Sequence, residues 1–280
     1  MAADCHIHML FDGVDWKAAL ARHAVGPEPG FIRKTLETYE KLGYTYLRDG
    51  GDRWGVGAMA RVLAPEYGIT YRTPLAPLCL EGHYGAFIGL TYRNLQEYTL
   101  LVRQQKAQGA DFIKIMISGI MDFNRYGVLT EPPLEPALIR QLVYIAHSEG
   151  MAVMAHANGS EPVIAAAEMG VDSVEHGAYL NREALAAMAQ YGTVWVPTLS
   201  TVGNLLGKGR HPDNQVGRIL ESALENLAWF KDRGFVAAGT DAGAWAVPHG
   251  VPTEAPLLAQ AGITQTHLID GLTIIRRKFG

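Results

Sequence analysis

The sequence predicts an α/β protein built as a single (β/α)8 barrel of the TIM-barrel type. Short β-rich runs alternate with helical periodicity along the whole chain, and the length of 280 residues suits one barrel domain. The clearest of these runs is apolar almost throughout, as in a parallel strand that helices cover on both faces. An open doubly wound sheet would need a glycine-rich phosphate turn after the first strand, and none follows it. We therefore treat residues 1–280 as one domain.

Eight runs are expected to form the strands of this barrel. Apolar, β-branched and aromatic residues mark them, and glycine or a polar loop ends most of them. They cover residues 4–8, 44–48, 69–80 (interrupted by Pro74 and Pro77), 111–117, 152–157, 173–176, 193–196 and 235–240.

Apolar residues recur at helical spacing between these runs. In the segment from Phe31, Ile32, Leu36 and Tyr39 share one face before Gly43 ends the pattern. Further helices are expected over residues 55–67, 95–108, 138–149, 162–168, 182–190 and 216–232, with one turn at 16–22 and one or two helices after residue 253, split near Gly262.

Composition and charge exclude several classes of protein. Charged residues make up 19% of the chain, the formal net charge is -4, and there is no basic run, so we expect no nucleic-acid partner. No stretch reaches the ~18 uninterrupted apolar residues of a membrane span, and the first residues do not resemble a signal peptide. Cys5 and Cys79 form neither a zinc motif nor a disulfide framework. We therefore predict a cytoplasmic protein without a membrane partner.

Polar residues stand at the predicted strand ends, where barrel enzymes place their active sites. His6 and His8 share one face of the first strand, because side chains alternate along a strand. His156 and His176 end the fifth and sixth strands, and Asp241 follows the eighth. Imidazole and carboxylate groups that converge in this way are typical ligands of divalent metals such as zinc. The pattern predicts a site for one or two metal ions.

Lys114 lies in the middle of the apolar fourth strand, where a charged side chain is unexpected. An ammonium group with a pKa of about 10.4 would be repelled by a metal ion. Reaction with carbon dioxide would turn the amine into a carbamate, N6-carboxylysine, whose two anionic oxygens can bridge two metals. We therefore hypothesise that a carboxylated Lys114 belongs to a two-metal centre.

Several motifs together resemble the amidohydrolase superfamily, in particular its imidazolonepropionase-like and zinc-dependent Xaa-Pro dipeptidase branch with a carboxylated lysine. They span essentially the whole chain: His-x-His, Asp-Phe-Ile-Lys-Ile-Met-x-Ser-Gly, the single His156, Glu-His-Gly-Ala-Tyr-Leu, Val-Pro-Thr-Leu and Gly-Thr-Asp-Ala-Gly. Most relatives carry a flanking β-sandwich built from residues before the first strand and after the last helix. Only five residues precede His6, so we expect a barrel that lacks this sandwich.

The resemblance implies six ligands for two divalent metal ions, with Zn²⁺ the expected metal. They are His6 and His8 with Asp241 on one metal, His156 and His176 on the other, and carboxylated Lys114 as the bridge. A hydroxide shared by the metals would attack a substrate carbonyl, because metal binding lowers the pKa of water to about 7. Asp241 would take the proton of that hydroxide and pass it to the leaving group.

We therefore predict a hydrolase that cleaves a C–N amide bond in a small substrate such as a dipeptide, an N-acyl amino acid or a cyclic amide. An esterase, lactonase or phosphoesterase with the same metals is an alternative, since the attacking hydroxide does not choose the leaving group. A mononuclear deaminase would leave Lys114 without a role. A barrel that only binds a ligand would not need all six ligand types. The oligomeric state stays open, a homo-oligomer included.

Five loop residues on the predicted active-site side are assigned to substrate binding. They are His83, Tyr179, His249, Arg125 and Tyr126. The last two would bind a substrate carboxylate, while the alternative for each of the five is a solvated or merely packed side chain. Arg48 and Asp49 end the second strand, where they form either an ion pair that braces the barrel or a ligand contact. The remaining histidines are interpreted as structural or solvated: His23, His147, His211 and His267.

Overall fold

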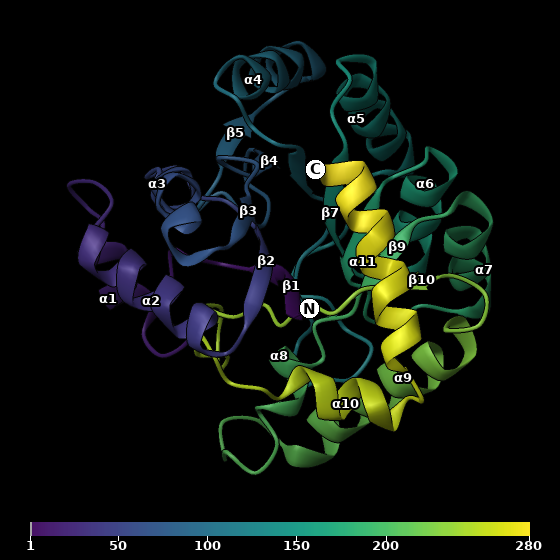
Figure 1. Ribbon diagram of the computed structural model, residues 1–280. Coiled ribbons are helices and arrows are strands. Elements are labelled where there is room, and N and C mark those ends of the chain that lie inside the picture. The colour runs from purple at the N-terminus through teal and green to yellow at the C-terminus, as the bar shows by residue number, and fades with distance from the viewer. Residues whose placement is uncertain (1) are drawn as a thin grey trace.

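Parallel strands form two sheets in the computed structural model, which describes residues 2–280 (Figure 1). One sheet contains β1 (Ala2–Ile7), β2 (Tyr44–Asp49) and β3 (Thr70–Arg72), in that order. The other has the order β10-β9-β8-β7-β6-β4-β5. Its strands are β4 (Leu78–Leu80), β5 (Leu90–Tyr92), β6 (Ile113–Met116), β7 (Val153–Ala157), β8 (Ser173–His176), β9 (Val194–Val196) and β10 (Phe235–Val236).

Backbone hydrogen bonds also connect the two sheets. Beside β1, the N–H of His8 donates to the carbonyl of Ala242 over 2.7 Å. Beside β3, the N–H of Asp111, just before β6, donates to the carbonyl of Thr73 over 3.0 Å. With all strands parallel, this is a TIM-barrel-like arrangement, in agreement with the predicted fold class.

Helices surround the strands (Figure 1). They are α1 (Trp16–Arg22), α2 (Pro29–Lys41), α3 (Val56–Leu63) with the 3-10 turn η1 (Ala64–Tyr67), α4 (Leu95–Ala107), α5 (Pro136–Ser148), α6 (Ser160–Glu168), α7 (Arg182–Tyr191), α8 (Ser200–Gly203), α9 (Asp213–Phe230), α10 (Glu254–Gln260) and α11 (Gln265–Phe279). The last helix, yellow in Figure 1, packs against β1, β9 and β10. None of the helices formed by residues 2–280 combines the length and apolar character of a membrane span.

Alternation along β7 shows how the strands separate two layers of core. Val153, Ala155 and Ala157 pack in one cluster beneath the helices, whereas Met154 belongs to a separate cluster on the opposite face of the strand. His156 therefore shares the inner face with Met154. All five residues of the strand are buried. A strand covered on both faces explains the near-continuous apolar runs of the sequence.

Most predicted elements are present with closely similar ends, and a few short ones differ. Helix α2 begins at Pro29, two residues before the predicted start at Phe31. Strand β10 is only two residues long, whereas a strand over residues 235–240 was expected. Beyond β10 the chain follows β1 through single hydrogen bonds and turns at Asp241, whose φ is 60°. β5 and α8 were not predicted, because elements of three or four residues show no detectable periodicity.

Candidate active site

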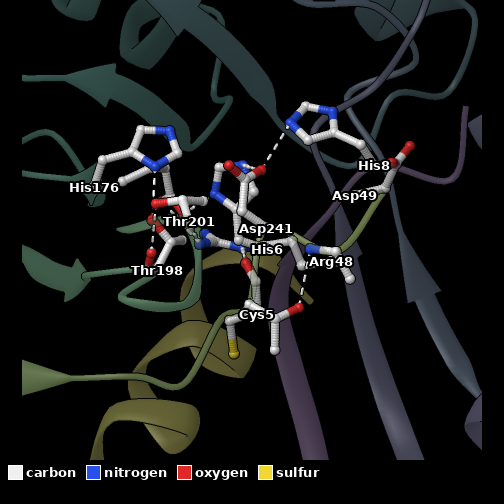
Figure 2. A network of polar contacts seen from close by, with 12 residues as sticks. Cys5, His6, His8, Arg48, Asp49, His176, Thr198, Thr201 and Asp241 are labelled. Atoms are coloured by element: carbon white, nitrogen blue, oxygen red, sulfur yellow. Dashed lines mark hydrogen bonds and ion pairs between the residues drawn. The ribbon is translucent and has the colours of Figure 1, made fainter. Parts of the chain in front are cut away.

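His6, His8 and Asp241 meet where β1 and the segment after β10 run side by side. Figure 2 shows their side chains close together, with a dashed line joining His8 to Asp241. Asp241 Oδ1 lies 3.4 Å from His6 Nε2 and 3.2 Å from His8 Nε2. One ligand atom of each residue lies within 4.8 Å of the other two. This spacing suits three ligands of one cation.

The facing atoms of this group lack ordinary hydrogen bonds. His6 Nε2 and Asp241 Oδ1 are buried, and neither has a hydrogen-bond partner among residues 2–280. A buried polar atom without a partner costs about 1–3 kcal/mol, so such atoms are rare unless something else satisfies them. An imidazole nitrogen and a carboxylate oxygen that face each other in this way fit a bound divalent metal ion.

A second pair of imidazoles stands beside the first. The ring centroids of His156 and His176 are 4.5 Å apart, and those of His6 and His176 are 5.1 Å apart. Burial lowers the pKa of His156 to about 3 and holds the pKa of His6 and of His176 well below the usual value. These imidazoles are therefore neutral at physiological pH, which is the form that binds metals.

Lys114 projects from β6 into the same region. It is 1% exposed, and no hydrogen bond or ion pair joins it to any other residue in 2–280. Burial lowers the pKa of Lys114 to about 8, despite the opposing effect of the Glu175 and Asp241 carboxylates. About a tenth of the amine is then neutral at pH 7, far more than for an ordinary lysine, and the neutral amine is the form that reacts with carbon dioxide.

A buried ion pair supports His6 from below. Glu175 Oε2 accepts a hydrogen bond from His6 Nδ1 over 2.6 Å, which leaves Nε2 directed toward Asp241. The guanidinium of Arg48 donates from Nη2 to both oxygens of Glu175, over 2.9 and 3.1 Å. Arg48 therefore forms a buried ion pair, which is one of the two roles that the sequence left open for it. Its partner is Glu175 and not Asp49. Such partners hold the tautomer and orientation of a metal-binding imidazole.

The backbone near the site adopts uncommon conformations. His176, Thr198 and Asp241 have φ values of 68°, 47° and 60°, in the left-handed region that costs most non-glycine residues about 1–3 kcal/mol. His176 Nδ1 and Thr198 Oγ1 lie 2.7 Å apart in a hydrogen bond, drawn as a dashed line in Figure 2. The indole of Trp195 donates to the carbonyl of His176 over 2.9 Å. Residues held in such conformations by their surroundings cluster at functional sites.

A large cavity lies over this group, with a volume of about 1050 Å³. His8, Lys114, His156, His176 and Asp241 all line it. Aromatic residues make up much of the rest: Phe11, Trp16, Tyr84, Phe87, Phe123 and Trp245. The structure thus places five of the six predicted ligands at one cavity, although they come from segments far apart in the sequence, and His6 lies buried beside Asp241.

The chain is similar in sequence to curated proteins of two kinds. It is 25% identical to ochratoxinase of Aspergillus niger over 234 residues, which are 71% of this chain and 47% of the relative. It is 28% identical to imidazolonepropionase of Acidiphilium cryptum over 235 residues, 75% of this chain and 57% of the relative. The chain thus spans about half the length of the curated relatives that it matches. No family model matches it.

Solved structures share the fold over almost the whole chain. A Xaa-Pro dipeptidase with bound methionine superimposes with a TM-score of 0.75 at 22% identity, over 99% of this chain and 75% of that one. The A. niger ochratoxinase gives a TM-score of 0.72 at 22% identity, over 99% and 69%. The chain thus resembles members of the amidohydrolase superfamily. The resemblance on which the sequence analysis relied is confirmed at this level.

The five residues assigned to substrate binding lie outside the lining of the cavity: His83, Tyr179, His249, Arg125 and Tyr126. Arg125 is exposed and pairs with Asp122, and the rings of Tyr126 and Tyr179 contact each other with centroids 5.3 Å apart. His249 bonds through Nδ1 to Tyr39 Oη and through Nε2 to the Phe11 carbonyl, each over 3.0 Å. It therefore supports a lining residue without reaching the cavity.

Sequence reasoning missed most of the residues that form the cavity wall. Tyr84, next to His83, reaches the cavity, and its ring lies 4.8 Å from that of His156. His211, interpreted as structural or solvated, lines the cavity beside Phe123. Aromatic residues in long loops were the available signal, but loop shape decides which of them face inward.

Proposed function

We propose that this protein is a metal-dependent amidohydrolase that cleaves a C–N amide bond in a small substrate. The convergence of His6, His8 and Asp241, with unpaired ligand atoms at a cavity, is the observation that carries the proposal. The relatives support the reaction class, because an imidazolonepropionase, an ochratoxinase and a Xaa-Pro dipeptidase are among them. The proposal includes closure of the two sheets into one barrel domain.

We further propose that the centre holds two divalent metal ions, with zinc the expected metal. Six side chains would hold them: His6, His8 and Asp241 on one, His156 and His176 on the other, and Lys114 as N6-carboxylysine between them. The neutral imidazoles and the lowered pKa of Lys114 support these roles. When bound, such metals lower the pKa of water and polarise a carbonyl group.

The residues of the chain would supply orientation and proton transfer. Asp241 Oδ1 faces the imidazoles of His6 and His8, so its second oxygen, Oδ2, would accept the proton of the attacking water and return it to the leaving nitrogen. Glu175 fixes the ring of His6 through Nδ1, and Thr198 does the same for His176. The apolar walls exclude bulk water, which strengthens these interactions.

Elemental analysis of protein prepared with zinc and bicarbonate tests the metal centre. We expect about two metal ions per chain in the wild type and one or fewer in Lys114→Ala, with a parallel loss of activity on a panel of dipeptides and N-acyl amino acids. Lys34→Ala, on the exposed face of α2, is the matched control. One metal in both proteins would contradict the two-metal proposal, and none in either would contradict metal-dependent hydrolysis altogether.

A further inference from the structure

Two aromatic walls and one cation border the cavity above the proposed metal centre. We propose that the cavity selects amides that carry both a large aromatic group and a free carboxylate, and that Arg210 binds the carboxylate. This inference rests on the proposed function and narrows its substrate class. It is carried by the ring contacts, the exposure of the rim and the charges of the lining residues.

The first wall is a connected series of rings that runs from the floor of the cavity to its mouth. The ring of Tyr84 lies 4.8 Å from that of His156 and 5.9 Å from that of Phe87. Phe87 in turn lies 6.4 Å from both Phe11 and Trp16. These separations are in the range of aromatic pairs, so an aromatic group entering the cavity extends an existing stack.

The second wall combines aromatic rings with a basic residue. The ring centroids of Phe123 and His211 are 5.3 Å apart, and the guanidinium of Arg210 lies 5.2 Å from the ring of Trp245. These four residues all line the cavity. The cation–π contact with Trp245 holds the guanidinium beside the cavity, so that it does not extend fully into solvent.

The size and exposure of the cavity favour a bulky ligand. Its volume of about 1050 Å³ is at the upper end of the roughly 300–1,000 Å³ of pockets for drug-sized ligands. Trp16, Phe87 and Trp245 are 46%, 41% and 53% exposed at its mouth. Large exposed apolar groups gathered around a concave site mark a binding surface, since burying them against a ligand removes them from water.

The charges leave one residue of the walls without a counter-ion. Asp15 caps the first turn of α1 through Oδ1, while Lys114 and Asp241 belong to the proposed metal centre. Arg210 is exposed, and among residues 2–280 no carboxylate lies within ion-pair distance of it. A guanidinium recognises a carboxylate through paired hydrogen bonds, so an anionic ligand complements this wall better than a neutral one.

Calorimetry with a ligand that resists hydrolysis tests the inference on the zinc-loaded full chain. The probes are N-tosyl-L-phenylalanine, its carboxamide, and the small N-methanesulfonylglycine. In the wild type, we expect the first probe to bind more tightly than either of the others. Arg210→Met should weaken binding of the carboxylate probe about tenfold and leave the carboxamide almost unaffected, because only the charged hydrogen bonds are lost. Trp245→Ala should weaken both aromatic probes.

Arg218→Met is the matched control. Arg218 is also exposed and lies over an aromatic ring, that of Tyr126 at 4.2 Å, but it does not line the cavity. We expect its variant to bind all three probes as the wild type does. Unchanged binding of N-tosyl-L-phenylalanine by Arg210→Met would overturn the inference, as would equally tight binding of N-methanesulfonylglycine by the wild type.

Turnover of N-benzoyl-L-phenylalanine by the same preparations separates this inference from the proposed function. If the wild type cleaves the amide and Arg210→Met cleaves it with a lower kcat/KM, the result supports both the inference and the proposed function. Cleavage that is insensitive to Arg210→Met overturns the inference and leaves the proposed function standing. Binding that depends on Arg210, without cleavage of any amide, contradicts the proposed function and leaves the binding inference standing.

Discussion

Glu175 shows how a single residue links the interior of the fold to the candidate metal site. It accepts a hydrogen bond from His6 and forms an ion pair with Arg48, and all three side chains are fully buried. The charge of Arg48 has no other carboxylate in ion-pair distance among residues 2–280. Removing one partner of a buried ion pair is costly, because the other charge stays in a medium of low polarity.

Glu175→Gln should therefore lower both stability and metal affinity. We expect a loss of about 3–5 kcal/mol in the free energy of unfolding, because Arg48 keeps its charge without a counter-ion. Zinc affinity should fall about 10–100-fold, because the amide no longer fixes the ring of His6. Urea unfolding and competition with a zinc-binding dye measure the two effects. Glu183→Gln, exposed on α7, should change neither, and equal zinc affinity in Glu175→Gln and wild type would contradict the positioning role.

The proposed ligands were predictable from the sequence, but their supporting residues were not. Alternation along a strand identifies His6 and His8 as neighbours, and an amine inside an apolar strand identifies Lys114 as unusual. The contact of Arg48 with Glu175 spans 127 residues of sequence, and no local pattern encodes such a pairing. Local periodicity reports which face a residue occupies, whereas the partner on that face follows from the three-dimensional arrangement.

At the scale of the elements, α11 covers the interior next to Arg48. The guanidinium of Arg48 lies 4.4 Å from the ring of Phe279, and Phe279 forms an edge contact with Phe112, at 5.1 Å between centroids. Phe279 is only 2% exposed. The helix thus shields the buried ion pair from water on the side opposite the cavity. Phe279, which anchors the C-terminal end of the helix, provides this shielding.

Phe279→Ala should destabilise the protein by about 3–5 kcal/mol, because it removes a buried ring and admits water to the ion pair. The midpoint of urea unfolding measures the loss. Ile269→Ala provides the control on the same helix. Ile269 is 53% exposed, so this substitution should lower the free energy of unfolding only slightly. Similar stability of the two variants would show that α11 does not act as a cover.

Glu254 joins the start of α10 to the start of α8. Its carboxylate accepts hydrogen bonds from the N–H of Leu199 and from the N–H and hydroxyl of Ser200, over 2.9, 2.7 and 2.7 Å. Burial raises the pKa of Glu254 to about 7, although these hydrogen bonds oppose the shift. A folded-state pKa above the unfolded one means that the folded protein holds this proton more tightly.

The sign of that shift predicts a pH dependence of stability. The contribution of Glu254 is complete below pH 4.5 and is lost as the pH rises through about 7. The loss is roughly 3 kcal/mol, from the difference between the two pKa values. Glu254→Gln does not titrate, so the stability of wild type relative to this variant should fall between about pH 5 and about pH 8 in urea titrations. A pH-independent difference would contradict the shift.

The helices and strands were largely predictable at this scale because each long helix shows one buried face and most buried strands are rich in apolar residues. The order and spacing of the elements were enough to indicate a TIM-barrel-like fold. Loop conformation was not predictable in the same way. His83 and Tyr84 are adjacent in a glycine-rich loop, yet only Tyr84 lines the cavity, and its orientation depends on contacts with Phe87 and His156.

At the scale of the whole molecule, the candidate metal site connects parts of the chain that are far apart. His6 comes from β1, His156 and His176 from β7 and β8, and Asp241 from the segment after β10. A metal ion held by such residues binds the folded chain and not the unfolded one. Its binding energy then adds to the stability of the whole fold.

Removal of metal should therefore lower the melting temperature of the entire domain in a single transition. At a free zinc concentration about 100 times Kd, the stabilisation is about 2.7 kcal/mol. Differential scanning calorimetry before and after treatment with a chelator measures it, and re-addition of zinc should restore the transition. A variant in which His6, His8, His156, His176 and Asp241 are all replaced by Ala should melt at the same temperature with and without zinc. A shift that persists in this variant would place the bound metal elsewhere.

The aromatic mouth of the cavity also gives the protein an optical reporter of its own. The chain has five tryptophans, and two of them line the cavity, both about half exposed: Trp16 at the start of α1 and Trp245 in the segment after β10. Trp195, by contrast, is fully buried among the strands. An aromatic ligand that enters between the walls would change the emission of the two exposed indoles and leave the buried one as an internal reference. Occupancy of the cavity can then be followed by the intrinsic fluorescence of the unlabelled protein.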